Sequence, residues 1–285
     1  MPTFSSHDGT TIGYRTTGSG PLLVCVAGGP RASGYLEDLG GLTAHRTLLC
    51  YDHRGTGDSA TPADPATYAY PSLADDLEAL RAHLGLEAVD LLAHSNGTVV
   101  AQAFAARHPH RVRRMVLVGP GAELYPDGGQ DLGGILASRG DEPWYPDVSQ
   151  AAFELLKLPP DAAPERVLDI LDRYAPAAYG RWGERQQQHA DVQRALFSLS
   201  AWAGFAKTDV DPADVVAGLA EVAAPVLVLT GDRDGLTGVA VGDLVAAAFK
   251  HGRHETLFGS GHYPWVDVPE RFVEVVAAFL AGGDS

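Results

Sequence analysis

Continuous apolar segments alternate with amphipathic segments along most of this chain. A strand that is apolar along its whole length has both faces buried, as in parallel sheets covered by helices. The segments between them place apolar residues three and four apart, as helices do; Leu73, Leu77, Leu80 and Leu84 are an example. The sequence therefore predicts an α/β fold with a mostly parallel sheet flanked by helices. The expected strands are 21–27, 45–52, 88–93, 111–119, 224–234 and 254–258, and the expected helices are 71–85, 97–108, 239–250 and 269–282.

The alternation stops in the middle of the chain. Residues 121–222 contain helix-like segments separated by loops, with no convincing strand pattern. We therefore expect an α/β core formed by residues 1–120 and 223–285, interrupted by a helical cap of residues 121–222.

Turn and cap residues predict the ends of two elements. Asp8-Gly9 lies between two β-prone segments, which indicates a hairpin near the N-terminus. Ser72 is expected to cap the start of the helix at 71–85, and Gly85 to end it.

The charge balance argues against several classes of partner. The chain has 36 acidic and 21 basic residues, a net charge of -15, and no cluster of Lys and Arg. An acidic surface repels nucleic acid and anionic lipid. There is also no apolar run near the roughly 20 residues that span a bilayer, and no pattern of a secretion signal. We expect a cytoplasmic protein that acts on a small molecule, without nucleic-acid or membrane partners.

The sequence gives no sign of a cofactor. His251 and His254 have no third metal ligand nearby, and no phosphate-binding loop is present. Cys25 and Cys50 lie within apolar segments, where a cysteine is expected to be buried and inert. We therefore expect neither a metal nor another cofactor.

A polar trio interrupts the join between an expected strand and an expected helix. Ser95 stands in Ala93-His94-Ser95-Asn96-Gly97, which is close to the pattern G-x-S-x-G. That pattern places a serine on a sharp turn between strand and helix, where its hydroxyl is exposed for nucleophilic attack. Ser95 is therefore the candidate nucleophile, with an ordinary turn as the alternative.

An acid and a base follow later strands. The strand at 224–234 ends in two carboxylates, Asp232 and Asp234, and either is a candidate. His262 follows the last expected strand in a loop of small residues. The order serine, acid, histidine, each just after a strand, is the order of the catalytic triad in α/β hydrolases.

The first apolar strand is followed by a glycine-rich loop that could supply backbone donors to a reaction intermediate. Gly28-Gly29-Pro30 follows Ala27 and has little side-chain bulk. The backbone N–H groups of Gly29 and Asn96 are the expected donors of an oxyanion hole. The alternative is a plain glycine turn.

These residues carry a resemblance to the α/β-hydrolase superfamily, over about residues 22–276. The segments "AGGPRAS" and "CYDHRGTGDSATP" resemble the proline iminopeptidase branch, which has an H-G-G-P-G loop and a Y-D-Q-R-G-x-G-x-S segment. The resemblance implies that Asp234 is the acid and His262 the base, and that Asp52 and Arg54 are structural.

The chain also departs from that branch. Ala27 replaces the loop histidine and Arg31 replaces the last glycine of the loop. The elbow reads A-H-S-N-G where the branch has G-G-S-W-G. The resemblance thus supports the serine-hydrolase fold more than it supports peptidase activity.

The residues that would contact a substrate are less clearly marked. Iminopeptidases hold the free amine of the substrate with an acidic cluster, for which Glu184 is the nearest analogue here. Trp182 is a candidate either for the pocket wall or for the cap's own core, and His94 either lines the pocket or fills space under the elbow. We expect a hydrolase of a small ester, lactone or amide. The alternatives are an aminopeptidase for N-terminal proline and a hydrolase-fold protein that binds a ligand with little turnover.

Overall fold

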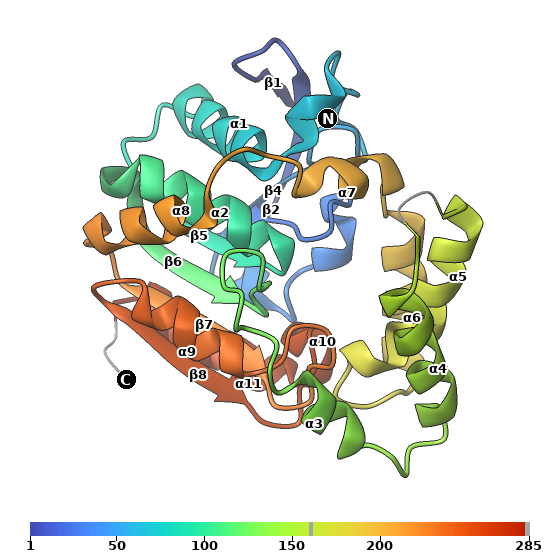
Figure 1. Cartoon of the computed structure of the whole chain (residues 1–285). Helices are drawn as coiled ribbons and strands as arrows, with labels where there is room; N and C mark the ends of the chain where they lie inside the picture. The colour runs from blue at the N-terminus through green and yellow to red at the C-terminus, as the bar shows by residue number, and fades with distance from the viewer. Residues whose placement is uncertain (160–161, 283–285) are drawn as a thin grey trace.

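An eight-stranded sheet forms the centre of the computed structural model, which describes residues 1–159 and 162–282 (Figure 1). The strand order is β1-β2-β4-β3-β5-β6-β7-β8. β1 pairs antiparallel with β2, and β2 with β4, while all pairings from β4 to β8 are parallel. The predicted, mostly parallel sheet is confirmed. The strands are β1 Thr3–Ser5, β2 Thr11–Gly18, β3 Leu22–Val26, β4 Thr47–Tyr51, β5 Val89–His94, β6 Val112–Val118, β7 Val226–Gly231 and β8 Gly252–Leu257.

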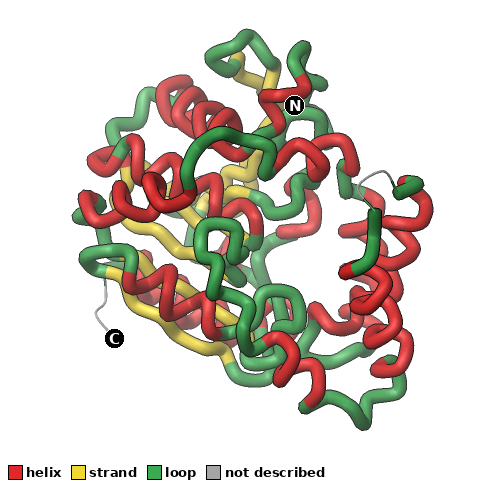
Figure 2. Tube along the Cα trace, in the orientation of Figure 1, coloured by secondary structure: helices red, strands yellow, loops and turns green. Residues whose placement is uncertain are grey.

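Helices cover both faces of the sheet, because its central strands are apolar on both sides (Figure 2). In β3, Val24 and Val26 pack in one cluster, while Leu23 and Cys25 pack in the other. The first cluster includes side chains from α1, α2, α8 and α9, and the second includes side chains from α10 and α11. The core helices are α1 Tyr70–His83, α2 Asn96–Arg107, α8 Pro212–Gly218, α9 Ala240–Ala247, α10 Pro264–Asp267 and α11 Pro269–Leu280.

The predicted hairpin and the predicted helix end at Gly85 are confirmed, and the predicted helix cap at Ser72 is wrong. β1 and β2 form the hairpin expected at Asp8-Gly9, with Gly9 at φ 85°. Gly85, at φ 66°, directly follows the C-cap of α1. Ser72, however, lies inside α1, which begins at Tyr70. Pro71 explains the earlier start, because a proline in the first turn lacks only an N–H that would have no helical partner anyway.

The segment 121–222 carries helices and, apart from the undescribed residues 160–161, no strand of the sheet. In Figure 1, α4, α5 and α6 stand to one side of the helices that cover the sheet. The end of the segment returns to the core, since Val215 and Leu219 belong to the cluster that α2 helps to form. The helices before α8 are α3 Leu132–Ala137, α4 Tyr145–Leu156, α5 Pro164–Tyr174, α6 Glu184–Ala195 and α7 Leu199–Phe205.

Buried ion pairs fix the loop that follows β4. The Arg54 side chain is fully buried and donates from Nε to Asp76 Oδ2 at 2.9 Å and from Nη1 to Asp8 Oδ2 at 2.6 Å. Asp52 Oδ1 accepts from the N–H and the hydroxyl of Ser33, each at 2.7 Å. These contacts agree with the structural role expected for Asp52 and Arg54.

Two further observations bear on the sequence expectations. Cys25 and Cys50 are both buried and free. No helix within residues 1–159 and 162–282 combines the length and the apolar character that crossing a membrane requires.

Candidate active site

Ser95 occupies a tight turn between β5 and α2. Its backbone is at φ 53° and ψ -130°, a left-handed conformation that costs a residue other than glycine free energy. The turn fits only because its neighbours are small. A Cβ on Gly97 would lie 2.6 Å from the carbonyl oxygen of Val26, and a Cβ on Gly28 would lie 2.6 Å from the Cβ of Ser95. The two glycines therefore let β3, β5 and α2 approach closely around a half-buried serine.

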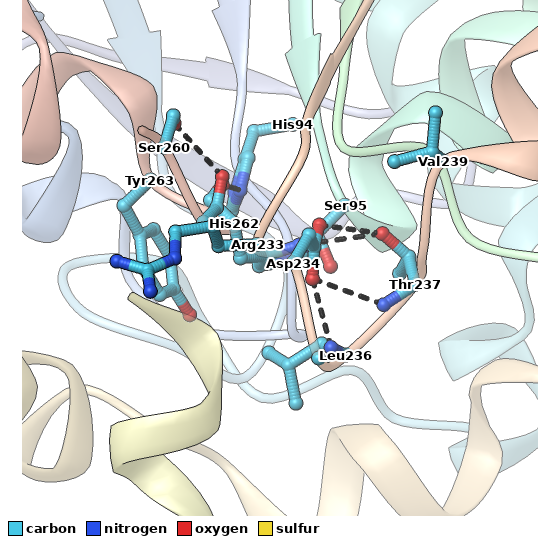
Figure 3. A network of polar contacts seen from close by, with 12 residues as sticks. His94, Ser95, Arg233, Asp234, Leu236, Thr237, Val239, Ser260, His262 and Tyr263 are labelled. Carbon is cyan, nitrogen blue, oxygen red and sulfur yellow. Dashed lines mark hydrogen bonds and ion pairs between the residues drawn. The ribbon is translucent and has the colours of Figure 1, made fainter. Parts of the chain in front are cut away.

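Asp234 follows β7 and is fully buried among hydrogen-bond donors (Figure 3). Its Oδ1 accepts from the N–H of Leu236 at 2.8 Å and of Thr237 at 3.1 Å, and its Oδ2 accepts from the Thr237 hydroxyl at 2.8 Å. Burial by itself would raise the pKa of Asp234. The charge and hydrogen bond of His262, together with these donors, outweigh burial and hold the pKa below its ordinary value. Asp234 is therefore ionised at neutral pH.

His262 joins this carboxylate to the surface of a cavity. Its Nδ1 lies 2.8 Å from Asp234 Oδ2, and its backbone N–H donates to the carbonyl of Ala178 at 2.7 Å. Gly119, which the sequence did not single out, lies against the ring, and a Cβ there would be 2.9 Å from Nδ1. Its φ of 53° fits the turn after β6, but no motif in the sequence marks it.

The structure distinguishes Asp232 from Asp234, which were both candidates for the acid that contacts His262. Asp232 does not contact His262; its Oδ1 accepts from the N–H groups of Gly259 and Ser260, at 2.6 and 3.3 Å. Asp232 thus holds the loop that carries His262, while Asp234 holds the imidazole itself.

Ser95 and His262 line the same cavity, so the three residues of the expected triad come together. Within the described residues the Ser95 hydroxyl makes no hydrogen bond of its own. Catalytic hydrogen bonds are often long without substrate and tighten when it binds.

The loop after β3 presents backbone donors beside Ser95. The N–H of Gly28 is used within the protein, since it donates to the Tyr35 hydroxyl at 2.6 Å. The N–H of Gly29 has no partner among the described residues, and that of Asn96 opens α2, where no helical partner exists. The Asn96 amide also donates from Nδ2 to the Gly29 carbonyl at 3.0 Å. Gly29 and Asn96 therefore lie side by side with their N–H groups free.

His94 lines the cavity, but its ring nitrogens are both engaged. Nδ1 lies 2.8 Å from the Tyr35 hydroxyl and Nε2 lies 2.9 Å from the carbonyl oxygen of His262. Burial and the charge of His262 hold the pKa of His94 well below its ordinary value. A neutral ring with two protein partners has no polar atom left for a substrate. Of the two readings for His94, filling space under the elbow describes it better than substrate binding.

The cavity at Ser95 has a volume of about 400 Å³. Helices α5, α6 and α7 contribute wall residues, including Leu171, Gln193 and Trp202. A smaller cavity of about 120 Å³ adjoins it and shares six of these wall residues: Arg31, Leu171, Gln193, Phe197, Leu236 and Tyr263. The size of the larger cavity suits a small molecule.

The two cap residues expected to contact a substrate lie elsewhere. Glu184 is exposed at the start of α6, where it accepts from Gln188 at 3.2 Å, and it does not line the cavity. Trp182 packs against Tyr179, with ring centroids 5.4 Å apart, and does not line the cavity either. Trp182 lies in the loop before α6 and Glu184 is the first residue of that helix, and the sequence pattern does not reveal that neither reaches the cavity. The ionisable side chains of Arg31, Glu123, His94 and His262 do line the cavity.

Comparison with known proteins agrees with this architecture. The family described as the alpha/beta hydrolase fold matches residues 21–267. This chain belongs to the α/β-hydrolase fold family.

Relatives of this α/β hydrolase carry several different names. A cis-3-alkyl-4-alkyloxetan-2-one decarboxylase from Shewanella oneidensis is 35% identical over 127 residues, or 44% of this chain, and the chain spans only 40% of that relative. A probable proline iminopeptidase from Streptomyces coelicolor is 33% identical over 204 residues, or 68% of this chain and 58% of that protein.

Solved structures share the fold over nearly the whole length. A putative aryl esterase from Burkholderia cenocepacia superposes with a TM-score of 0.76 and 22% identity, covering 99% of this chain and 98% of the other. The predicted resemblance to the α/β-hydrolase superfamily is confirmed, and a probable proline iminopeptidase is among the relatives.

Proposed function

We propose that this α/β hydrolase is a serine hydrolase that cleaves an ester, lactone or amide bond of a small molecule. The observation that carries the proposal is the contact between His262 and the buried carboxylate of Asp234, made at the wall of the cavity that Ser95 also lines. A buried, ionised acid that orients a histidine beside a serine is the arrangement needed to activate a hydroxyl.

In the proposed mechanism, His262 takes the proton of the Ser95 hydroxyl as the oxygen attacks the substrate carbonyl carbon. Asp234 accepts the Nδ1–H of His262 and stabilises the imidazolium that forms. The N–H groups of Gly29 and Asn96 hold the oxyanion of the tetrahedral intermediate. His262 then gives its proton to the leaving group, and an acyl group remains on Ser95.

The second half of the reaction repeats these roles with water. His262 removes a proton from a water molecule, which attacks the acyl carbonyl. The intermediate collapses, the carboxylic acid product leaves, and the proton returns to Ser95 through His262.

The helices before α8 supply the wall of the cavity opposite Ser95, and we place the substrate-selecting cap there. Because α8 packs within the core, this cap ends before residue 212, ten residues or so earlier than the sequence pattern suggested. In this proposal the helices α5, α6 and α7 contribute to substrate selection, and residues at the strand ends perform the chemistry.

The iminopeptidase alternative has one observation in its favour. An aminopeptidase needs an acid near the nucleophile to hold the substrate amine, and Glu123 lines the cavity although Glu184 does not. The side chain of Glu123 is exposed, and desolvation raises the pKa of its carboxyl. Glu123 is therefore the residue whose substitution tests the aminopeptidase alternative.

The test compares kcat/KM for p-nitrophenyl butyrate and for proline p-nitroanilide, with labelling of Ser95 by a fluorophosphonate. We expect ester turnover and labelling in the native protein, and neither in Ser95→Ala. A strong preference for the anilide, lost in Glu123→Gln, would establish the aminopeptidase instead. Absence of labelling would favour a ligand-binding protein with little turnover.

A further inference from the structure

Arg31 is a departure from the iminopeptidase-like loop that the proposed mechanism does not use. It follows Gly29 by two residues, and its side chain folds back over that glycine. A Cβ on Gly29 would lie 3.0 Å from both Cγ and Nε of Arg31. The Arg31 side chain therefore lies against Gly29, whose N–H is expected to hold the oxyanion, and Arg31 lines both cavities.

Aromatic rings and an amide hold the guanidinium in place. Its carbon lies 5.4 Å from the centroid of the Tyr35 ring and 5.3 Å from that of Phe197. Nη1 donates to the side-chain oxygen of Gln193, which also accepts from the Tyr263 hydroxyl at 2.7 Å. These two cation–π contacts and the hydrogen bond restrict the position of the guanidinium.

The charge of Arg31 has no acid to balance it. Among the described residues, no carboxylate oxygen lies within 4.0 Å of its guanidinium nitrogens. Its Nε is buried and has no hydrogen-bond partner in that part of the chain. The side chain as a whole is half-buried, and Nη2, which makes no hydrogen bond within the described residues and is not among the buried atoms, is the donor that a bound anion can reach.

The acids on the cavity walls do not cancel this cation. Glu123 lines the larger cavity and makes no ion pair with Arg31, and Asp172, which lines the smaller cavity, pairs with Arg194 at 3.0 Å.

We propose that Arg31 binds a carboxylate of the substrate, so that this enzyme selects small esters or lactones with an anionic group a few bonds from the reacting carbonyl. The inference rests on the proposed function for its catalytic part. The planar guanidinium presents parallel donors to a carboxylate, and its place beside Gly29 sets the short distance between the two groups of the substrate.

The test uses two esters with the same number of acyl carbons, monoethyl glutarate and ethyl pentanoate, and measures the ratio of their kcat/KM values by proton release. The native enzyme should favour the glutarate ester. Arg31→Gln should lower the ratio about 10-fold or more, and Arg31→Lys should lower it less, because a cation remains. The matched control Arg271→Gln removes an exposed arginine of α11 and should leave the ratio unchanged.

Two results would overturn the inference. Either the native enzyme prefers the neutral ester, or Arg31→Gln slows both esters equally, which would make Arg31 a structural support of the loop. Thermal unfolding of each variant shows that it is folded.

A binding measurement separates this inference from the proposed function. Calorimetry with glutarate on Ser95→Ala should show binding that Ser95→Ala with Arg31→Gln lacks. Binding without turnover of any ester by the native protein would reject the hydrolase and keep the anion site. Absence of glutarate binding would reject the anion site, whatever the esters show.

Discussion

His94 donates a hydrogen bond from Nε2 to the backbone carbonyl of His262, at 2.9 Å. Because a carbonyl only accepts, the proton of the neutral His94 ring is on Nε2, and Nδ1 accepts from the Tyr35 hydroxyl at 2.8 Å. The same hydroxyl accepts from the N–H of Gly28. A buried chain of hydrogen bonds therefore runs from the loop after β3, through Tyr35 and His94, to the backbone of the proposed base.

Removing the hydroxyl at the centre of this chain should slow the reaction. Tyr35→Phe leaves the Gly28 N–H and the His94 Nδ1 without a partner, so both the oxyanion loop and His262 lose a support. We expect kcat to fall about 10-fold with a smaller change in KM, and the free energy of unfolding to fall by about 1–3 kcal/mol. Steady-state kinetics and chemical denaturation measure the two effects.

The matched control for that variant is Tyr51→Phe. The Tyr51 hydroxyl is also buried, but it has no hydrogen-bond partner among the described residues. Its loss should leave kcat unchanged. An equal effect of the two substitutions on kcat would show that the chain through Tyr35 has no part in positioning.

Replacing the proposed nucleophile should remove activity without weakening the fold. Ser95→Ala deletes a hydroxyl that has no protein partner in the described chain, and alanine meets the same backbone strain at φ 53°. We expect turnover to fall by at least about 10³-fold, with Tm nearly unchanged. Retained activity in a protein free of wild-type contamination would rule out Ser95 as the nucleophile.

Substitutions of the two neighbouring carboxylates, Asp232 and Asp234, should have very different effects on kcat. Asp234→Asn replaces the acceptor of the His262 Nδ1–H and should lower kcat by about 10³–10⁴-fold. Asp232→Asn keeps an oxygen that can accept from Gly259 and Ser260, so its effect should be small. The measurement is kcat of both variants on one ester. A larger loss in Asp232→Asn than in Asp234→Asn would show that Asp232 is the acid that orients His262.

Acid should destabilise the protein through buried neutral histidines. Burial lowers the pKa of His189 to about 4, and its Nε2–H donates to the Tyr35 carbonyl at 2.8 Å. Between pH 6.5 and pH 4 the unfolded chain binds this proton and the folded chain does not. Stability is therefore complete above about pH 6.5 and falls by about 1.4 kcal/mol per pH unit below it, with His94 adding in the same direction.

Thermal unfolding at pH 7.5 and pH 5 measures this effect. His189→Gln should show a smaller drop in Tm between the two pH values than the native protein. The control His110→Gln changes an exposed histidine and should keep the native drop. An undiminished drop in His189→Gln would place the pH sensitivity in other groups.

Local patterns in the sequence were enough to predict the mostly parallel sheet and to choose candidate site residues at the ends of its strands. Continuous apolar segments gave the parallel strands, because burial on both faces leaves no polar position within them. The glycines around Ser95 marked the elbow, since only small residues allow the close approach seen at Gly28 and Gly97. The chain order of Ser95, the acid and His262 then followed from the ends of successive strands.

Contacts between distant segments decided what the sequence left open. Asp232 and Asp234 are alike in sequence, and only the path of the loop after β8 brings His262 to one and the backbone of that loop to the other. Helical patterns in the cap did not reveal which face meets the cavity, so Glu184, expected there from the resemblance to iminopeptidases, lies outside it. The loop after β3 gave no sign that Arg31 would line the cavity. The sequence by itself determined which elements form and where reactive groups follow them, because those depend on neighbours along the chain. Only the tertiary structure decided which groups share a cavity, because that depends on how elements far apart in sequence pack together.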